Sequence, residues 1–233
     1  MQPARLSHEV LAAVFQVRDG RLCVLLWQRG QAPFRGRWSL PGGSLGERER
    51  LGASIARHLA SKVDVAELAH LEQLETRSDP KRDPRGRVLG TAYLGLVPAD
   101  QRPQLPTDTA WHPADALPRT GFDHGSIVES ARERLRAKLS YTSIAFALAP
   151  PSFTISELRG LYAAALGYDV SSTNLQRVLL RRGVIEATGE RRAPGPAGGR
   201  PAARFRFTRR EVWVTDPAAT LRPRSLPGGG RHA

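Results

Sequence analysis

The stretch Trp38-Ser39-Leu40-Pro41-Gly42-Gly43 decides the fold of this chain, together with the run that follows it as far as Val65. Pro41 fixes its own φ angle and has no N–H, whereas Gly42 and Gly43 allow backbone angles and close approaches that side chains forbid. A tight turn that leads into a helix leaves free N–H groups at the start of that helix, where a phosphate binds readily. The turn alone is equally consistent with an ordinary loop. The spacing of the residues after it therefore decides between an ordinary loop and a phosphate-binding turn.

The residues after the turn follow a fixed spacing. Five residues separate Gly43 from Glu49, and seven more separate Glu49 from Arg57. This register continues through Leu59 and Val65 and resembles the Nudix box, which has a Gly, a Glu, an Arg-Glu pair, two adjacent glutamates and aliphatic residues at these spacings. The resemblance implies that residues 1–140 form a Nudix-type α/β/α sandwich with a mixed sheet, an α/β (α+β) fold that binds an effector.

Three metal-binding positions of the box depart from the family pattern, and Asp64 stands where the family has glycine. His58 stands where the family has its first essential Glu, and Ser61 and Lys62 replace the paired glutamates. In the family these side chains share one helix face and hold the Mg²⁺ that neutralises a diphosphate and activates water. An ammonium there would repel the metal and attract a phosphate instead. We therefore expect no catalytic residues, no bound metal, no required cofactor and no enzymatic activity. Weak metal binding by Glu47, Glu49 and Asp64 remains the alternative.

Charge and composition restrict the partners. The 233 residues include 35 Lys and Arg against 22 Asp and Glu, a formal net charge of +13. This excess predicts a polyanionic partner, with a merely well-solvated surface as the alternative. The single Cys23 excludes an internal disulfide framework, and no apolar run is long enough to span a membrane. We expect a cytoplasmic protein that does not interact with membranes.

Apolar patterning predicts the remaining elements of the first 140 residues. An Asp19-Gly20 pair between apolar runs predicts a hairpin, and apolar residues at every fourth position predict helices. The expected strands cover 8–17, 22–27, 68–77, 88–97 and 108–111, and the expected helices cover 48–62 and 123–139, the second with Asp123 as its N-cap.

Two arginine-bearing loops adjoin the box. The loop 28–37 leads into the Gly-Gly turn, and the charged loop 78–87, followed by Thr91-Ala92-Tyr93-Leu94, resembles that of ADP-ribose-type Nudix proteins. Its arginines either hold a diphosphate or ribose, or simply lie in an exposed loop. The candidate ligand contacts are Arg35, Arg37, Trp38, Gly42, Gly43, Arg57, Lys62, Arg77 and Arg85.

The composition changes after residue 140. Residues 141–151 read as a semi-rigid interdomain linker that ends in Pro150-Pro151, and residues 141–233 contain 14 Arg, no Lys and 6 acidic residues. Arginine forms bidentate contacts with phosphate and guanine, so this part is the better candidate for nucleic-acid binding.

Residues 152–215 predict a winged helix-turn-helix. Thr154 to Glu157 matches a capping box with Phe153 as its hydrophobic staple, and the apolar pattern after it ends at Gly167. A second helix starts at Ser171 or Ser172 and would enter the major groove, unless the pair is a generic helical hairpin. Strands at 184–187 and 204–207 flank a basic wing loop, and residues 216–233 are expected to be disordered. The candidate DNA contacts are Thr154, Ser156, Ser172, Thr173, Asn174, Gln176, Arg177, Arg181, Arg182, Arg200 and Arg204.

A degenerate Nudix box followed by a basic winged helix resembles the NrtR family of Nudix-related transcriptional regulators. The resemblance covers about residues 8–210 and implies a homodimeric repressor of NAD-biosynthesis genes that binds double-stranded DNA at a palindromic operator. It also implies that ADP-ribose, or a related small nucleotide, binds the Nudix part and weakens operator binding. Some members control sugar-utilisation genes instead. Two alternatives stay open, namely an active ADP-ribose or nucleotide-sugar pyrophosphatase with an accessory nucleic-acid-binding tail and an RNA-binding Nudix protein.

Overall fold

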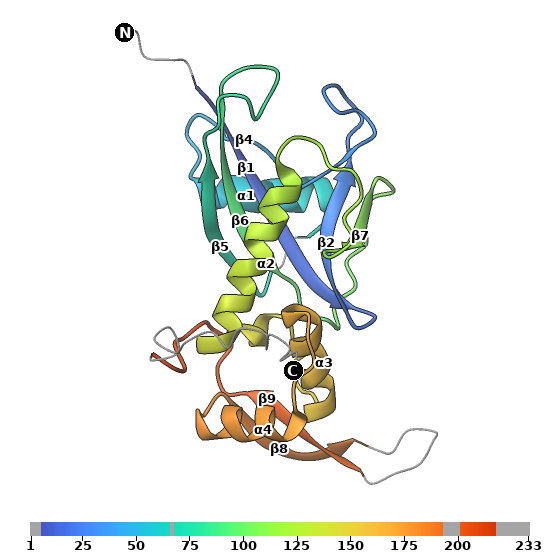
Figure 1. Ribbon diagram of the computed structural model, residues 1–233, viewed down its shortest axis with the longest axis vertical. Coiled ribbons are helices and arrows are strands. Elements are labelled where there is room, and N and C mark those ends of the chain that lie inside the picture. The colour runs from blue at the N-terminus through green and yellow to red at the C-terminus, as the bar shows by residue number, and fades with distance from the viewer. Residues whose placement is uncertain (1–5, 66–67, 193–200, 218–233) are drawn as a thin grey trace, which may run out of the picture.

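The computed structural model describes residues 6–65, 68–192 and 201–217, which form a larger sheet-and-helix part and a smaller helical part with a hairpin (Figure 1). The larger part contains β1 (Ser7–Arg18), β2 (Arg21–Gln28), β3 (Trp38–Ser39), β4 (Gly42–Ser44), α1 (Leu51–Val63), β5 (His70–Arg77), β6 (Val88–Leu96), β7 (Thr109–Pro113) and α2 (His124–Tyr141). The smaller part contains the 3₁₀ turn η1 (Ile144–Ala147), α3 (Ile155–Leu166), α4 (Ser172–Arg181), β8 (Ile185–Arg192) and β9 (Ala202–Phe207).

One mixed sheet organises the larger part. Its strand order is β3-β2-β1-β6-β5, with β4 paired to β1 and β7 paired to β2. Among the strands that the structure describes, only the β1–β6 pair is parallel, and the predicted β1–β2 hairpin is confirmed, with Arg18 opposite Arg21. Because successive side chains of a strand point to opposite faces, the buried residues of β1 serve two cores in turn. Leu11 and Phe15 pack in one core, whereas Val10 and Val14 pack in the other.

The two long helices lie on opposite faces of this sheet (Figure 1). Ile55 and Leu59 of α1 are buried in one core, and Ile127 and Leu135 of α2 are buried in the other, which confirms the predicted apolar faces. Helix α1 begins three residues later than predicted. It ends at Asp64, whose left-handed conformation (φ 53°) lets its N–H bond the Leu59 carbonyl in the place where the Nudix box has glycine.

The expected linker over residues 141–151 is wrong as a semi-rigid connection. Ile144, Phe146 and Leu148 are each at most 2% exposed, and they belong to the same core as Phe15 of the sheet. Residues near the end of the described chain also contact this segment, because the Ser143 N–H donates to the Trp213 carbonyl at 3.0 Å. Apolar residues that look like a linker in the sequence therefore join the two parts into one continuous core.

The smaller part is the predicted winged helix-turn-helix. Thr154 caps α3 in the predicted capping box, with Glu157 reaching back to the Thr154 N–H at 2.7 Å, and Ser171 caps α4. Phe153 is fully buried and pairs with Phe205 of β9. The expected wing loop falls largely on residues 193–200, and most of the expected disordered tail falls on 218–233, both outside the described residues. The expected tail begins too early, because the Asp216 N–H donates to the Tyr141 carbonyl at 3.2 Å.

None of the helices in the described part of the chain combines the length and the apolar character that crossing a bilayer requires.

Candidate functional site

The glycine turn is shaped by two close contacts. Gly42 has φ 156°, and a Cβ there would lie 2.1 Å from the Val10 carbonyl oxygen. A Cβ on Gly43 would lie 2.4 Å from Cε1 of His58. No side chain fits at either position, so the turn packs directly onto β1 and α1, which is the close approach that the sequence predicts.

The three substituted positions of the Nudix box differ in what they face. His58 is buried, and its Nε2 lies 3.0 Å from the Ser44 carbonyl. Burial lowers the pKa of His58, so the imidazole is neutral near pH 7 and Nε2–H donates to that carbonyl. Ser61 is exposed to solvent. Lys62 donates from Nζ to the Gly42 carbonyl at 2.6 Å, which places an ammonium against the glycine turn.

Lys62 is held from several directions. Its Nζ lies 5.1 Å from the centre of the Trp27 ring. Burial is the main cause that lowers the pKa of Lys62, with the positive charges of Arg29 and Arg57 acting in the same direction and Glu9 opposing them. A partly buried cation surrounded by other cations gains from any anion that enters beside it.

Of the three carboxylates that could have formed an alternative metal site, Glu49 is engaged by an arginine and Glu47 is exposed. Arg57 donates from Nε and from a terminal nitrogen to Glu49, both at 2.7 Å, and this pairing lowers the pKa of Glu49 to about 2. Asp64 ends α1, as described above. Over the residues that the structure describes, no group of three or more His, Cys, Asp or Glu side chains is placed to hold a metal ion.

Seven side chains beside the glycine turn form what we call the arginine–aromatic cluster. Arg29 lies over the Phe122 ring at 4.8 Å, and Arg85 lies over the same ring at 5.4 Å. Phe34 and Phe122 meet edge to face at 4.8 Å between ring centres, and both have left-handed backbones, with φ 62° and 53°. Bulky residues rarely adopt this conformation, and such strain concentrates at functional sites. The cluster consists of Trp27, Arg29, Phe34, Arg37, Lys62, Arg85 and Phe122.

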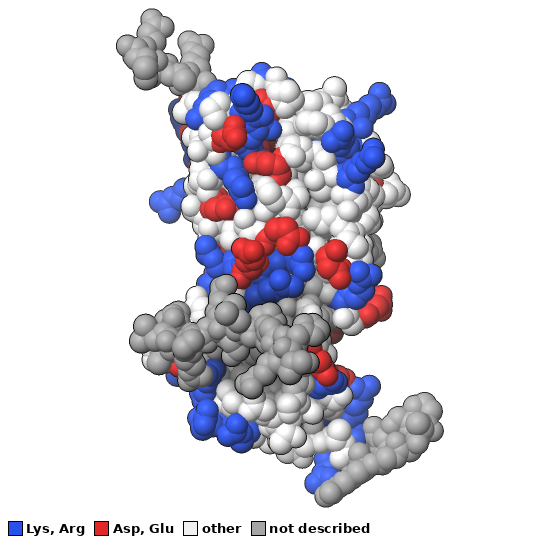
Figure 2. All heavy atoms as spheres, viewed as in Figure 1, with Lys and Arg blue, Asp and Glu red and all other residues white. Residues whose placement is uncertain are grey.

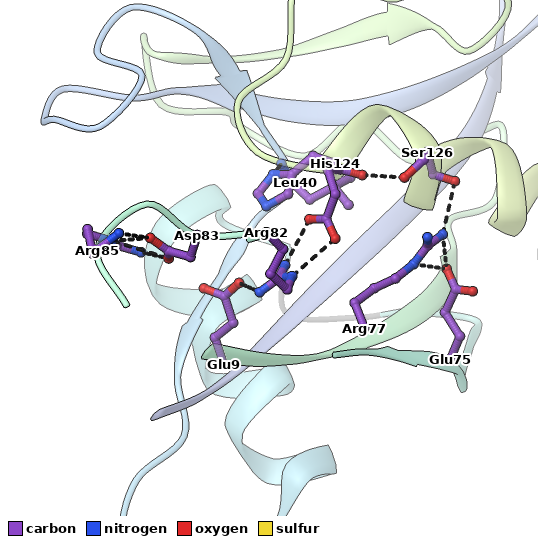
Figure 3. Close-up of polar contacts among 10 residues, drawn as sticks. Glu9, Leu40, Glu75, Arg77, Arg82, Asp83, Arg85, His124 and Ser126 are labelled. Carbon is purple, nitrogen blue, oxygen red and sulfur yellow. Dashed lines mark hydrogen bonds and ion pairs between the residues drawn. The ribbon is translucent and has the colours of Figure 1, made fainter. Parts of the chain in front are cut away.

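A buried arginine anchors the loop 78–87 to the sheet (Figure 3). The Arg82 side chain is 1% exposed and donates to Glu9 at 2.7 Å and to both carboxylate oxygens of Asp123 at 2.9 and 3.1 Å. Its guanidinium passes over Gly90, where a Cβ would lie 2.9 Å from the central carbon. Burial alone would raise the pKa of Asp123, but the hydrogen bonds from Arg82 outweigh burial and lower it. Asp123 occupies the predicted N-cap position, yet its carboxylate does not cap the helix, which corrects that expectation.

His124 connects the start of α2 to the glycine turn. It is buried, and its Nδ1 accepts a hydrogen bond from the Leu40 N–H at 2.9 Å (Figure 3). Burial lowers the pKa of His124 to about 3, so the ring is neutral at physiological pH. The helix that reaches the smaller part at Tyr141 therefore begins at the candidate ligand site.

The predicted ligand contacts divide into two groups. Gly42, Gly43, Arg37, Lys62 and Arg85 lie at the glycine turn or in the arginine–aromatic cluster, although Arg85 is also paired with Asp83 at 2.6 Å. The other four lie outside the cluster or bond other residues of the protein. Arg57 is held by Glu49, and Arg77 donates to Glu75 at 2.7 Å and to Ser130 at 3.0 Å. Arg35 is exposed, and Trp38 lies half-buried against His112.

Sequence reasoning missed Phe34, Phe122 and the Arg82 network. Arg82 contacts residues 73 and 41 positions away, and no local pattern records such pairings. The one sequence feature that indicated this region was the high arginine content of the loops 28–37 and 78–87.

Helix α4 presents an exposed polar face. Leu179 is its only fully buried side chain among those that the structure describes, and Gln176 is half-buried. Arg177 donates to the Asn174 side chain at 2.8 Å, which orders both on the surface. The exposed candidate DNA contacts on this helix are Ser172, Thr173, Asn174, Arg177 and Arg181.

Three predicted DNA contacts are engaged within the protein, and of these only Arg182, the C-cap of α4, lies beside the exposed candidates of that helix. Thr154 is buried as the cap of α3, because the capping box uses its hydroxyl. Arg182 pairs with Asp216 and donates to the Ser140 carbonyl at 3.4 Å. Arg204 donates from Nε to the Ser152 hydroxyl at 3.1 Å. Ser156 is exposed at the start of α3, and Arg200 lies outside the described residues.

Two family models match the chain. A model of the NUDIX domain matches residues 7–131, and a model described as the NrtR DNA-binding winged helix domain matches residues 145–207. The second match begins within the buried segment that follows α2.

Individual relatives resemble most of the chain or its NUDIX part. The ADPR responsive transcriptional repressor NtrR of Acinetobacter baylyi is 32% identical over 219 residues, which are 91% of this chain and 86% of the relative. The crystal structure of Shewanella oneidensis NrtR complexed with a 27mer DNA has 31% identity and a TM-score of 0.73, over 85% of this chain and 92% of that one. The NUDIX domain of that protein, in a cocrystal structure with ADP ribose, has 38% identity and a TM-score of 0.52, over 57% of this chain and 90% of that one.

Proposed function

We propose a function for this chain from the premise that it belongs to the NrtR family of Nudix-related transcriptional regulators. It is a repressor that binds duplex operator DNA through α4 and the β8–β9 wing, and it releases that DNA when ADP-ribose binds beside the glycine turn. The regulated genes are those of NAD biosynthesis, as the resemblance to the family implies. A cytoplasmic location follows from this role.

The position of Lys62 supports binding of ADP-ribose without hydrolysis. Its ammonium lies against the Gly42 carbonyl at 2.6 Å, on the helix face where the Nudix box places metal-binding glutamates. A diphosphate that enters this turn meets a fixed positive charge in place of Mg²⁺, so it is neutralised but no metal-bound water attacks it. A sensor that does not destroy its signal needs this arrangement.

The arginine–aromatic cluster is suited to the other parts of the ligand. Aromatic faces stack on an adenine ring, and guanidinium groups donate to phosphates and ribose hydroxyls. Because Arg29 and Arg85 already lie on the Phe122 ring, a ligand that displaces either one also displaces the loop that carries it.

Helix α2 joins this site to the DNA-binding part. It starts at His124, beside the glycine turn, and ends at Tyr141, where the buried segment leads into α3. In the proposed homodimer two recognition helices read the half-sites of a palindrome, and their spacing depends on how this helix is held. If ADP-ribose lowers operator affinity, then operator DNA lowers ADP-ribose affinity by the same factor.

The test is operator binding with and without ADP-ribose. Fragments of the source genome that bind the full-length protein are selected first, and their affinity is then measured by fluorescence anisotropy over a range of ADP-ribose concentrations. A fall in affinity without release of AMP supports the proposal. Unchanged affinity excludes this effector, and rapid Mg²⁺-dependent release of AMP supports an active hydrolase instead.

A further inference from the structure

A cavity of about 310 Å³ lies where the larger part meets the smaller one. Four segments form its walls, namely the β1–β2 turn, the residues directly after β7, the second half of α2 and the C-terminal end of α3 (Figure 1). Its volume is at the lower end of the range for small-molecule sites in proteins. It lies at the opposite end of β1 from Glu9 and the Arg82 network, and a strand of this length spans about 35 Å. The cavity is therefore separate from the arginine–aromatic cluster.

Arg136 is the unusual side chain of this cavity. Its Nε is buried and has no hydrogen-bond partner among the described residues. A buried donor without a partner is costly, and native proteins rarely leave one unless a ligand or water completes it. Gly167 makes room for the guanidinium, because a Cβ there would lie 2.8 Å from a terminal nitrogen of Arg136.

Two further arginines line the cavity, and each is paired with an exposed carboxylate. Arg21 pairs with Asp115 at 2.7 Å, but these side chains are 52% and 59% exposed. Arg132 donates from one terminal nitrogen to both carboxylate oxygens of Glu129, at 2.7 and 2.9 Å; the Arg132 side chain is 14% exposed and that of Glu129 is 52% exposed. The Arg21–Asp115 pair is exposed and contributes little to stability, so an incoming anion exchanges for Asp115 at small cost.

An aromatic ring completes the lining. Tyr168, directly after α3, is 64% exposed, a high value for a large aromatic side chain beside a cavity. A phenol ring there offers a flat face to a sugar or a base. Three guanidinium groups match a dianionic phosphate better than a single carboxylate, and the volume leaves room beyond the phosphate for a ring.

We propose that this cavity is a second ligand site, which takes a small phosphorylated metabolite of about mononucleotide size. The phosphate binds Arg136 and Arg132, and the ring lies against Tyr168. Because α2 and α3 form opposite walls, the bound ligand holds the DNA-binding part in one orientation relative to the sheet. Such a ligand changes operator affinity, and operator DNA changes its affinity by the same factor.

The test titrates the full-length protein with AMP, with ribose 5-phosphate and with inorganic phosphate by isothermal calorimetry. We expect AMP or ribose 5-phosphate to bind the wild type more tightly than inorganic phosphate. Arg136→Gln should weaken this binding at least tenfold. Arg134→Gln is the matched control, because it removes the same charge from the same helix outside the cavity, and it should bind as the wild type does.

A second arm separates this site from the glycine turn and guards against misfolding. The same titration is repeated with saturating ADP-ribose. If the organic phosphate still binds, the result supports a separate site. If its binding is lost, the ligand belongs to the glycine turn and the proposal is overturned. Tyr168→Ala changes an exposed side chain, so it keeps the fold and should weaken AMP binding several-fold. The proposal is also overturned if neither organic phosphate binds at millimolar concentration, or if Arg136→Gln binds as tightly as Arg134→Gln.

Discussion

The arginines of the loop 78–87 and those of α4 show how one residue type serves two tasks. In the loop, Arg82 is buried between Glu9 and Asp123, and Arg85 is paired with Asp83. On α4, Arg177 and Arg181 are exposed and have no acidic partner among the described residues. The arginines of the loop form ion pairs that hold the loop in place, whereas the charges of the α4 arginines remain available to bind a polyanion.

The surface shows the same contrast. On the face drawn in Figure 2, many Lys and Arg of the upper part lie beside Asp and Glu, although a basic group at its upper right stands apart from them, and the basic residues of the lower part have few acidic neighbours. A polyanion is attracted where positive charge is not neutralised locally. The arginine count alone therefore does not predict where nucleic acid binds; the pairing of each arginine does.

The largest effect is expected from removing Arg82. In Arg82→Ala, Glu9 and Asp123 both lose their partner in a buried setting, which costs about 3–5 kcal/mol in the free energy of unfolding. For a chain of this size the melting temperature should fall by roughly 10 °C, measured by calorimetry. Arg21→Ala is the control, because the side chains of Arg21 and its partner Asp115 are 52% and 59% exposed, and it should cost less than about 1 kcal/mol. Equal losses in the two variants would contradict the contrast.

The next effect is expected at the ligand site. Lys62→Met removes a charge-assisted contact with the diphosphate, worth about 1.5–3 kcal/mol, and should weaken ADP-ribose binding roughly 10- to 100-fold in calorimetric titrations. Removing divalent ions with EDTA should leave the wild-type affinity unchanged. Ser61→Ala, at an exposed neighbouring position, serves as the control. A wild-type affinity that collapses in EDTA would show that a metal, and not Lys62, carries the diphosphate.

The DNA face should respond to two different substitutions in two ways. Arg177→Ala should cost about 1–3 kcal/mol for the preferred operator and reduce discrimination against altered half-sites. Arg181→Ala should weaken binding to all sequences and reduce the slope of log affinity against log salt by about 0.9. Arg204→Ala is the comparison, because Arg204 bonds Ser152 and should affect binding little. If Arg204→Ala weakens binding as much as Arg177→Ala, the assigned face is wrong.

The smallest effect concerns pH. His124 is neutral when folded, with its pKa lowered to about 3, while the unfolded chain takes up a proton near pH 6.5. Between these two pKa values the unfolded state binds more protons than the folded state. The neutral His124 therefore makes its full contribution to the free energy of unfolding above about pH 6.5, and this contribution falls by about 1.4 kcal/mol for each pH unit below that value. Denaturant unfolding from pH 7 to 5 should show this loss. His124→Asn should flatten the pH dependence, and an unchanged slope would contradict the assignment.

Local patterns predicted the parts of the fold that local interactions determine. Leu51, Ile55 and Leu59 predicted the buried face of α1, because apolar residues one turn apart cover one side of a helix. The capping box at Thr154 was predicted and confirmed, because its hydrogen bonds connect residues only three apart. The glycine turn was predicted for the same reason, from residue types that the backbone requires there.

The sequence misled where the outcome depended on distant partners. Residues 141–151 read as a linker, because nothing local shows that Phe146 meets Phe15 in a common core. Nothing local in the sequence shows that Arg182 contacts Asp216 or that Arg204 contacts Ser152, and their role as DNA contacts stays a prediction. The sequence did not predict a role for Phe34 and Phe122, because their contact and their left-handed backbone conformations result from how the loops fold.

The sequence by itself determined that this chain has a Nudix-like part with an ammonium in place of metal ligands and a basic winged helix after it. Spacing and residue type suffice for both, because a helix face and a capping box follow from the chemistry of neighbouring residues. Only the tertiary structure decided which arginines remain unpaired, how the two parts share one core and where the cavity beside Arg136 lies. These features depend on residues far apart in the chain, which only folding brings into contact.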